Sequence, residues 1–99
     1  VTSEAAARRY GLAGGKGSLA PGKDADFVLA DPAGVTTIEG RTLLSKGNIT
    51  PFEGMRLSGR FLKTFVRGRA VYDSSRADRN EHPIAAEPGS GKFLRWGYR

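Results

Sequence analysis

Ninety-nine residues with 38% apolar and 26% charged side chains, a formal net charge of +6 and no cysteine predict one small domain with a modest core. The lack of cysteine excludes disulfides and thiolate metal sites, and no apolar run approaches the roughly 18 residues of a membrane-spanning helix. The Lys and Arg residues are scattered, with Arg8-Arg9 as their only adjacent pair. This distribution favours a solvated basic surface over a concentrated nucleic-acid site.

The N-terminal segment predicts a short helix over residues 3–10. Ser3 is a candidate N-cap, alanines fill the middle, and Gly11 is expected to end the helix with Leu12 folding back as its hydrophobic contact. The segment lacks the apolar stretch of a secretory signal, so we expect a cytoplasmic protein. The start at Val1 instead of Met suggests a fragment or a processed product.

A glycine-rich stretch follows, with Gly14, Gly15 and Gly17 around Lys16. A phosphate-binding loop would place Lys and then Ser or Thr at the opening of a helix. The sequence SLAPGKDADFVLAD after Gly17 is instead typical of a turn and a strand. We therefore interpret the glycines as a flexible connector.

The first strand is predicted at the apolar run Phe27–Ala30, buried on both faces and ended by Asp31-Pro32. Pro21-Gly22 predicts a turn before it. Asp24 and Asp26 invite a calcium-site interpretation, but the twelve-residue loop with its glycine and terminal glutamate is missing. Turn-capping roles are favoured for these aspartates.

The middle of the chain predicts a short strand at residues 35–38, a segment at 42–44 compatible with helix or strand, and a loop over residues 45–60. Glu53 has no second carboxylate at a short spacing, so a paired-acid catalytic role is not favoured. The candidate structural loop at the centre of this stretch consists of Pro51, Phe52, Glu53 and Gly54.

A β-hairpin is predicted over residues 61–72, because FLKTFV alternates and Arg67-Gly68 can form a tight turn. The apolar side chains of both strand regions are expected to share one cluster. Its members are Phe27, Val28, Leu29, Phe61, Phe65, Val66, Val71 and Tyr72.

The tail, residues 73–99, begins with a polar stretch to residue 81 that predicts a loop and ends in an apolar segment. Phe93, Leu94 and Trp96 form a possible interface, because an exposed apolar terminus is unusual in a soluble monomer. His82 is the only histidine and cannot by itself supply a triad or a zinc site. No catalytic, metal-binding or substrate-binding residue is nominated.

Several motifs together resemble the C-terminal region of cyclic amidohydrolases, the group of hydantoinase (dihydropyrimidinase), dihydroorotase and allantoinase. AARRYGL (6–12) resembles the short helix after the last barrel strand, although the family often has Asn-Pro where this chain has Ala5-Ala6. KGSLAPGKDADFVLAD (16–31) resembles the re-entry into a small β-sandwich, and SKGNITPFEGMRLSGR (45–60) the loop before the last hairpin. FVRGRAVYD (65–73) resembles that hairpin, and GSGKFLRW (89–96) is similar to hydantoinase endings.

This resemblance implies a mainly β fold with one short N-terminal helix, the small C-terminal β-sandwich part of a (β/α)₈-barrel amidohydrolase. Residues 1–15 would be the helix and connector that follow the barrel. Residues 16–99 would be the sandwich segment, with the loop 45–60, the hairpin 61–72 and the tail 73–99. The Pro51–Gly54 stretch would be a conformational corner, anchored by its phenylalanine, with the glutamate as a hydrogen-bonding or ion-pair residue.

Enzymes of this group hydrolyse a cyclic amide or imide with a pair of divalent metals, usually zinc, at the C-terminal end of the barrel. Their ligand motifs find no match here, so the resemblance implies zinc in the parent barrel, no cofactor in this chain and no activity of the chain alone. It also implies that this chain packs against the parent (β/α)₈ barrel and that the full-length protein forms a homo-oligomer. Neither a membrane nor nucleic acid is expected as a partner.

Two functions remain open. The chain could complete the sandwich and the oligomer contacts of a cyclic amidohydrolase, or it could be a free-standing basic β-module that binds a protein partner or nucleic acid. Salt-dependent nucleic-acid binding would support the module, and a His-x-His barrel encoded upstream would support the amidohydrolase. The tail favours hydantoinase, while SKGNITPF also suits dihydroorotase and allantoinase.

Overall fold

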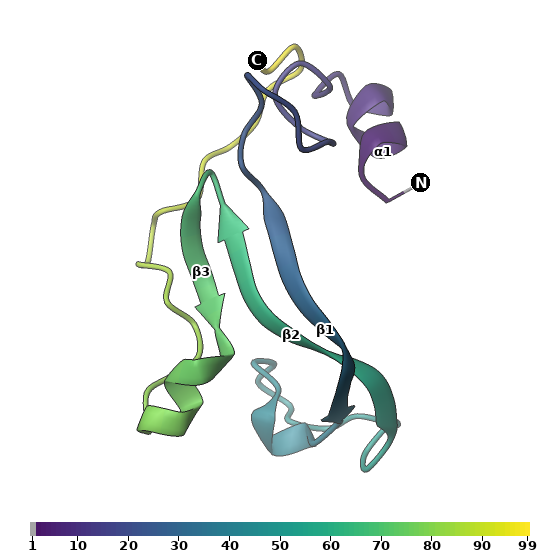
Figure 1. Ribbon diagram of the computed structural model, residues 1–99, viewed down its shortest axis with the longest axis vertical. Helices are drawn as coiled ribbons and strands as arrows, with labels where there is room; N and C mark the ends of the chain where they lie inside the picture. Colours follow the sequence, from purple (N-terminus) through teal and green to yellow (C-terminus); the bar gives the residue numbers. More distant parts are fainter. Residues whose placement is uncertain (1) are drawn as a thin grey trace. The chain divides into compact units, whose positions relative to one another are not determined.

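The structure, a computed structural model, describes residues 2–99 and is mainly β with little helix (Figure 1). Its elements are α1 (Glu4–Arg9), β1 (Phe27–Thr37), the 3₁₀ helix η1 (Gly40–Thr42), β2 (Arg56–Val66), β3 (Arg69–Asp73) and the 3₁₀ helix η2 (Ser74–Arg79). Three antiparallel strands form one sheet in the order β1-β2-β3. The chain divides into unit 1, residues 1–29 and 62–99, and unit 2, residues 30–61. The expected mainly β character with one short N-terminal α-helix is confirmed.

Helix α1 ends as predicted but begins without the predicted cap. Gly11 has a φ of +66°, and the amides of Gly11 and Leu12 donate to carbonyls of the last helical turn at 3.3 and 2.7 Å. These are the two hydrogen bonds of a Schellman motif. Ser3 makes no side-chain capping hydrogen bond. The Ser3 prediction is wrong, because its backbone (φ −120°, ψ −81°) is not in the β region that a capping residue typically adopts.

Strand β1 runs through Asp31-Pro32, so the prediction that this pair ends the strand is wrong. Proline lacks an amide hydrogen, but β1 is an edge strand, and an edge strand tolerates proline where its amide side faces solvent. The strand predicted separately at residues 35–38 is largely the last part of β1. Burial on both faces is also wrong for this chain, since Val28 and Leu29 remain 49% and 46% exposed.

Unit 2 folds into a corner between β1 and β2. The amide of Ile38 donates to the carbonyl of Met55 at 2.9 Å, and the amide of Gly54 returns a bond to Ile38 at 2.8 Å. Strand β2 begins at Arg56, so the predicted loop 45–60 is too long at its C-terminal end. Pairing with β1 sets the start of β2. The local sequence around Arg56 has no regular alternation, so it does not indicate this start.

Strands β2 and β3 form the predicted antiparallel hairpin. Its turn places Arg67 and Gly68 at φ values of +50° and +73°. Two positive φ angles are the mark of a type I′ turn, whose twist matches that of the flanking strands. The register pairs Val66 with Arg69 and contains one bulge further along the ladder.

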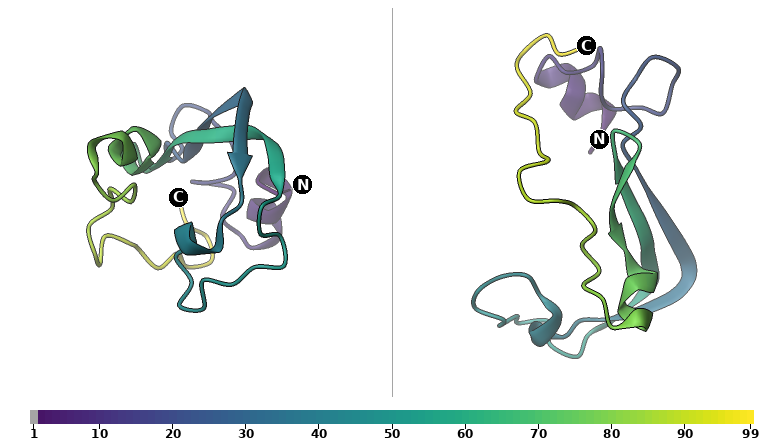
Figure 2. Two further views of the ribbon diagram at one scale, coloured as in Figure 1. Left: turned by 90° about the horizontal axis from the view of Figure 1, so that it is seen from below. Right: turned by 90° about the vertical axis from the view of Figure 1, so that its left-hand side faces the viewer.

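The predicted loop at 73–81 contains η2, so it is more regular than its composition suggests. The Asp73 carboxylate begins this helix by accepting the Ser75 amide at 3.0 Å and the Ser75 hydroxyl at 2.7 Å. The chain then returns along the hairpin, where Ile84 bridges to Tyr72 in an antiparallel contact (Figure 2). It ends beside the glycine-rich segment, as the hydrogen bonds described below show.

Apolar burial is sparse. Within residues 2–99, Ala7 is the only buried apolar side chain, at 6% exposure. Phe27 and Phe65 stack with ring centroids 4.6 Å apart and remain half-buried. Phe61 is 67% exposed. The prediction that Phe61, Val28 and Leu29 belong to the apolar cluster is therefore wrong. One sheet without a second layer cannot bury both of its faces.

Candidate functional site

The most highly connected polar group of unit 1 surrounds Lys16. Its Nζ lies 2.6 Å from Asp24 Oδ2 and 2.5 Å from Asp26 Oδ2, and the Lys16 side chain is only 12% exposed. The Tyr98 hydroxyl donates to Asp24 Oδ2 at 3.0 Å, and the backbone amide of Arg67 donates to Asp26 Oδ1 at 2.7 Å. This Lys16 cluster, defined as Lys16, Asp24, Asp26, Arg67 and Tyr98, therefore ties the start of β1 to the hairpin turn and to the tail.

Three pKa values shift in the cluster. Burial opposes the charge on Lys16, but hydrogen bonds to Asp24 and Asp26 outweigh it and raise the pKa of the ammonium. The hydrogen bond from Lys16 lowers the pKa of the Asp24 carboxyl, and the bond from Tyr98 adds to this effect. The Tyr98 hydroxyl has a raised pKa, chiefly because it donates to Asp24. All three shifts favour the paired charges and the neutral phenol.

The Lys16 cluster changes the interpretation of its members. The Lys16 ammonium is held by two carboxylates that would repel a phosphate, so the structure gives no support to a phosphate loop. Asp26 does cap a turn, but that turn is the hairpin 41 residues away. Asp24 pairs with Lys16 and Tyr98, so the turn-capping prediction is wrong for its side chain. Lys16 lies 8 and 10 residues before the two aspartates in the sequence, a spacing that does not by itself signal these pairs.

The glycine-rich segment is the surface on which the tail lies. A methyl group at Gly11 would fall 2.5 Å from the Trp96 ring, and one at Gly15 would fall 2.7 Å from the Tyr98 ring. The amide of Gly97 donates to the carbonyl of Gly11 at 2.8 Å. The glycines are therefore required for close approach of the tail, in contrast to the predicted flexible connector.

The predicted loop residues form a separate corner in unit 2. The Glu53 carboxylate accepts the amide of Gly40 at 2.6 Å, and a methyl group at Gly40 would collide with the carbonyl of Asn48. Phe52 is 53% exposed and does not anchor the corner within this chain. Pro51 is also exposed, and Gly54 has a φ of +76° that its turn requires.

The remaining sequence candidates do not assemble into a reactive centre. His82 is exposed, and its Nδ1 accepts the amide of Ile84 at 3.2 Å. Over residues 2–99, no three or more His, Asp or Glu side chains gather closely enough to hold a metal ion. The same stretch has no helix long and apolar enough to cross a membrane.

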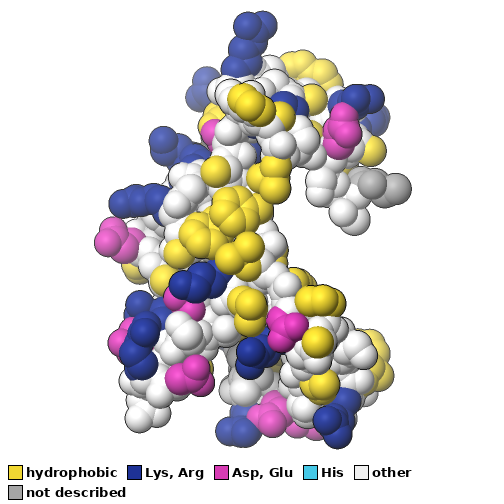
Figure 3. Space-filling view, viewed as in Figure 1, with side chains coloured by type: hydrophobic (Ala, Val, Ile, Leu, Met, Phe, Trp, Pro, Cys, Tyr) yellow, Lys and Arg dark blue, Asp and Glu magenta, His cyan; other side chains and the backbone are white. Residues whose placement is uncertain are grey.

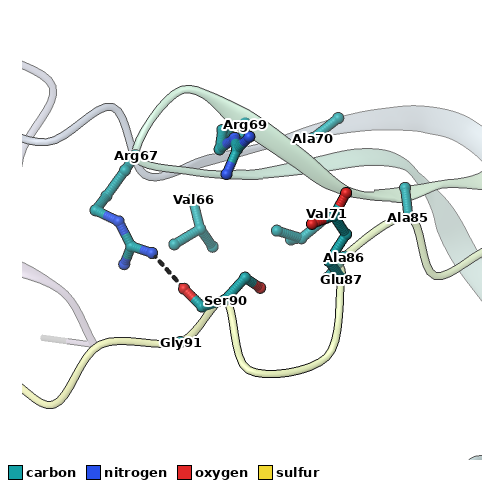
Figure 4. Close-up of a pocket in the computed structure, with 10 residues that line it drawn as sticks. All are labelled: Val66, Arg67, Arg69, Ala70, Val71, Ala85, Ala86, Glu87, Ser90 and Gly91. Atoms are coloured by element: carbon teal, nitrogen blue, oxygen red, sulfur yellow. Dashed lines mark hydrogen bonds between the residues drawn. The ribbon is translucent and has the colours of Figure 1, made fainter.

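A pocket opens in unit 1 between the hairpin and the tail (Figure 4). Val66, Val71 and Ala85 contribute apolar surface, and Arg67 Nη2 donates to the carbonyl of Ser90 at 2.8 Å. Its lining contains no histidine and a single carboxylate, that of Glu87. The pocket therefore lacks a paired acid and base.

Exposed apolar side chains are the most unusual feature of the surface. Phe93 and Trp96 are 91% and 75% exposed, and Leu94 is half-buried. Apolar side chains appear on both units in the space-filling view, interspersed with basic residues (Figure 3). In unit 2, Ile49 is 86% exposed.

Comparison with known families gives a match over residues 1–71 to the amidohydrolase family. The chain is 39% identical over 89 residues to an allantoinase of Rubrobacter xylanophilus, covering 90% of this chain and 18% of that protein. It is 44% identical over 73 residues to a dihydroorotase of Anaeromyxobacter sp., covering 74% of this chain and 16% of that protein. It is 34% identical over 95 residues to a D-phenylhydantoinase of Escherichia coli, covering 96% and 19%. The chain thus spans less than a fifth of these curated relatives.

Comparison with solved structures also finds hydantoinases and dihydropyrimidinases. A D-hydantoinase (dihydropyrimidinase) from Thermus sp. superimposes with a TM-score of 0.81 at 34% identity, covering 96% of this chain and 19% of that one. A dihydropyrimidinase from Brevibacillus agri superimposes with a TM-score of 0.78 at 30% identity, covering 100% and 20%.

Proposed function

This chain belongs to the amidohydrolase family, within its cyclic amidohydrolase group, and from this premise we propose that it is the C-terminal part of a longer, metal-dependent enzyme that hydrolyses the C–N bond of a cyclic amide. In this proposal the chain completes a small β-sandwich beside a (β/α)₈ barrel and supplies contacts between subunits. The barrel would carry every catalytic residue.

The exposed apolar surface is the observation that carries this proposal. Phe93 and Trp96 in unit 1 and Ile49 in unit 2 are 91%, 75% and 86% exposed, although soluble monomers rarely present large apolar patches to water. Obligate interfaces are hydrophobic, so exposed apolar side chains of this kind are typical of one. The curated relatives are more than five times as long as the matched segments, so a remainder of the same polypeptide could cover it.

A divalent metal pair, expected to be zinc, would supply Lewis-acid chemistry in the barrel. The described residues do not fit a metal site, so we assign no step of the reaction to this chain. Its proposed roles are packing and the positioning of the barrel against neighbouring subunits.

Phe93, Leu94 and Trp96 are the proposed interface residues, and Arg95 between them would face solvent. Each large apolar side chain that becomes buried in the assembly would contribute about 1.5–3 kcal/mol. Substitution of Phe93, which is 91% exposed, by Ser in the full-length protein should therefore weaken assembly, while Lys92→Ser nearby should not. Analytical ultracentrifugation measures the difference.

The activity test compares three preparations with zinc: the 99-residue chain, the remainder of the protein, and both together. The proposal expects no turnover of hydantoin, dihydroorotate or allantoin by the chain alone. It expects turnover by the full-length protein, and a gain when the chain is added to the remainder. Turnover by the isolated chain would contradict the proposal, and salt-dependent binding of the isolated chain to nucleic acid would favour a free-standing module instead.

A further inference from the structure

The last residues of the tail make several contacts with the glycine-rich segment and with Asp24. Tyr98 contributes three of them: its hydroxyl bonds to Asp24, its ring lies against Gly15, and the Lys16 ammonium lies 5.6 Å from its ring centroid. A cation at this distance from an aromatic face is attracted by the ring quadrupole. The Tyr98 side chain thus contacts Gly15 of the glycine-rich segment as well as Asp24 and Lys16.

Backbone contacts support the same arrangement. The Gly97 amide donates to the carbonyl of Gly11 at 2.8 Å, and the Asp24 amide donates to the carbonyl of Gly15 at 2.9 Å. The Gly68 amide donates to the carbonyl of Ala25 at 2.9 Å. The glycine-rich segment therefore lies between the tail on one side and the entry to β1 on the other, and that entry is bonded to the hairpin turn.

We propose that residues 96–98 are a latch that closes on the glycine seat, defined as Gly11 and Gly15, and is locked by the hydrogen bond from the Tyr98 hydroxyl to Asp24. The latch holds the end of α1 against the entry to β1. Opening of the latch would free the glycine seat and deprive Asp24 of one of its two hydrogen-bond donors. The geometry makes the latch a local device, because its contacts join only residues 96–98, the glycine seat and Asp24.

Two substitutions separate the latch from general packing. Gly15→Ala fills the seat, because its methyl group would lie 2.7 Å from the Tyr98 ring, and the backbone of Gly15 does not have a positive φ. Tyr98→Phe keeps the ring and removes only the hydroxyl. Gly91→Ala is the matched control, since its methyl group would meet nothing within 4 Å and its φ is not positive.

The experiment is hydrogen exchange with mass spectrometry on the intact protein, followed at peptides that cover residues 11–17 and 93–99. Gly15→Ala should speed exchange at the Gly97 amide about tenfold or more. Tyr98→Phe should speed it severalfold, up to about tenfold, the effect expected when a hydrogen bond to a charged group is lost at a partly exposed site. Gly91→Ala should leave exchange unchanged.

Exchange at residues 93–99 that is unchanged in both Gly15→Ala and Tyr98→Phe would overturn the latch. A Gly15→Ala protein that unfolds globally would be recognised by faster exchange in β2 and β3, and Tyr98→Phe would then decide alone. The latch does not depend on the proposed enzyme function, because the same exchange pattern is expected whether or not the protein hydrolyses a cyclic amide.

Discussion

The carboxylate of Glu53 accepts the backbone amide of Gly40 at 2.6 Å, across thirteen residues of chain. Gly40 is buried, and a side chain there would meet the carbonyl of Asn48. The glutamate of the Pro-Phe-Glu-Gly stretch is therefore engaged in holding two ends of a corner together.

Replacement of Glu53 by alanine should loosen this corner and lower the free energy of unfolding by about 1 kcal/mol, the typical value of one hydrogen bond at a partly exposed site. Glu53→Gln, which retains an acceptor oxygen, should lose less. Exchange of the Gly40 amide reports the effect directly. Equal protection of that amide in wild type and Glu53→Ala would show that the bond does not hold the corner.

The hairpin turn makes a prediction about backbone strain. Gly68 has a φ of +73°, and a methyl group there would meet nothing closer than 4.0 Å. Gly68→Ala should therefore destabilise the hairpin by about 1–2 kcal/mol through backbone strain alone. Arg67→Asn should be tolerated at the backbone, because Asn adopts a positive φ more readily than other residues with a side chain. Thermal unfolding should show the loss in Gly68→Ala. Because Arg67→Asn and Arg67→Ala both lose the bond from Arg67 Nη2 to Ser90, Arg67→Asn should be the more stable of these two, and the reverse order would contradict the turn type.

The lowered pKa of the Asp73 carboxyl predicts that the folded protein loses stability in acid. Hydrogen bonds from Ser75 and then from Lys63 lower the pKa of its carboxyl from 3.8 to about 2. Because the unfolded chain binds this proton more readily, the contribution of Asp73 is present above about pH 4 and is lost as the pH falls towards 2. Asp73→Asn should flatten the stability profile between these values. Identical acid profiles for Asp73→Asn and wild type would exclude the carboxylate as the cause.

The stacked rings of Phe27 and Phe65 predict a measurable coupling free energy between the two side chains. Their rings stack at 4.6 Å with 17° between the planes, and such pairs contribute about 0.5–1.5 kcal/mol beyond their area burial. A double-mutant cycle with Phe27→Leu and Phe65→Leu should recover this coupling energy from unfolding measurements. A cycle that uses Phe61→Leu in place of Phe65→Leu is the control, because Phe61 is largely exposed, and it should give additive effects.

Local chemistry in the sequence was sufficient for several elements. Alanines followed by Gly11 specify a helix and its Schellman end, and the Arg67-Gly68 pair between alternating runs specifies a hairpin. These features depend on neighbours within a few residues, so they can be predicted without knowledge of the rest of the chain. The order of motifs was also sufficient for the family.

Tertiary structure decided the features that depend on distant partners. The passage of β1 through Pro32 follows from its place at the sheet edge, and the exposure of Phe61 follows from the lack of a second layer over the sheet. The hydrogen bond from Tyr98 to Asp24 spans 74 residues of chain, and the seat that Gly15 provides for the Tyr98 ring joins segments more than eighty residues apart. A sequence pattern reports local periodicity, whereas these contacts form only when the tail packs against the residues that follow α1. Only in that arrangement does the lack of a side chain at Gly15 allow the Tyr98 ring to approach closely.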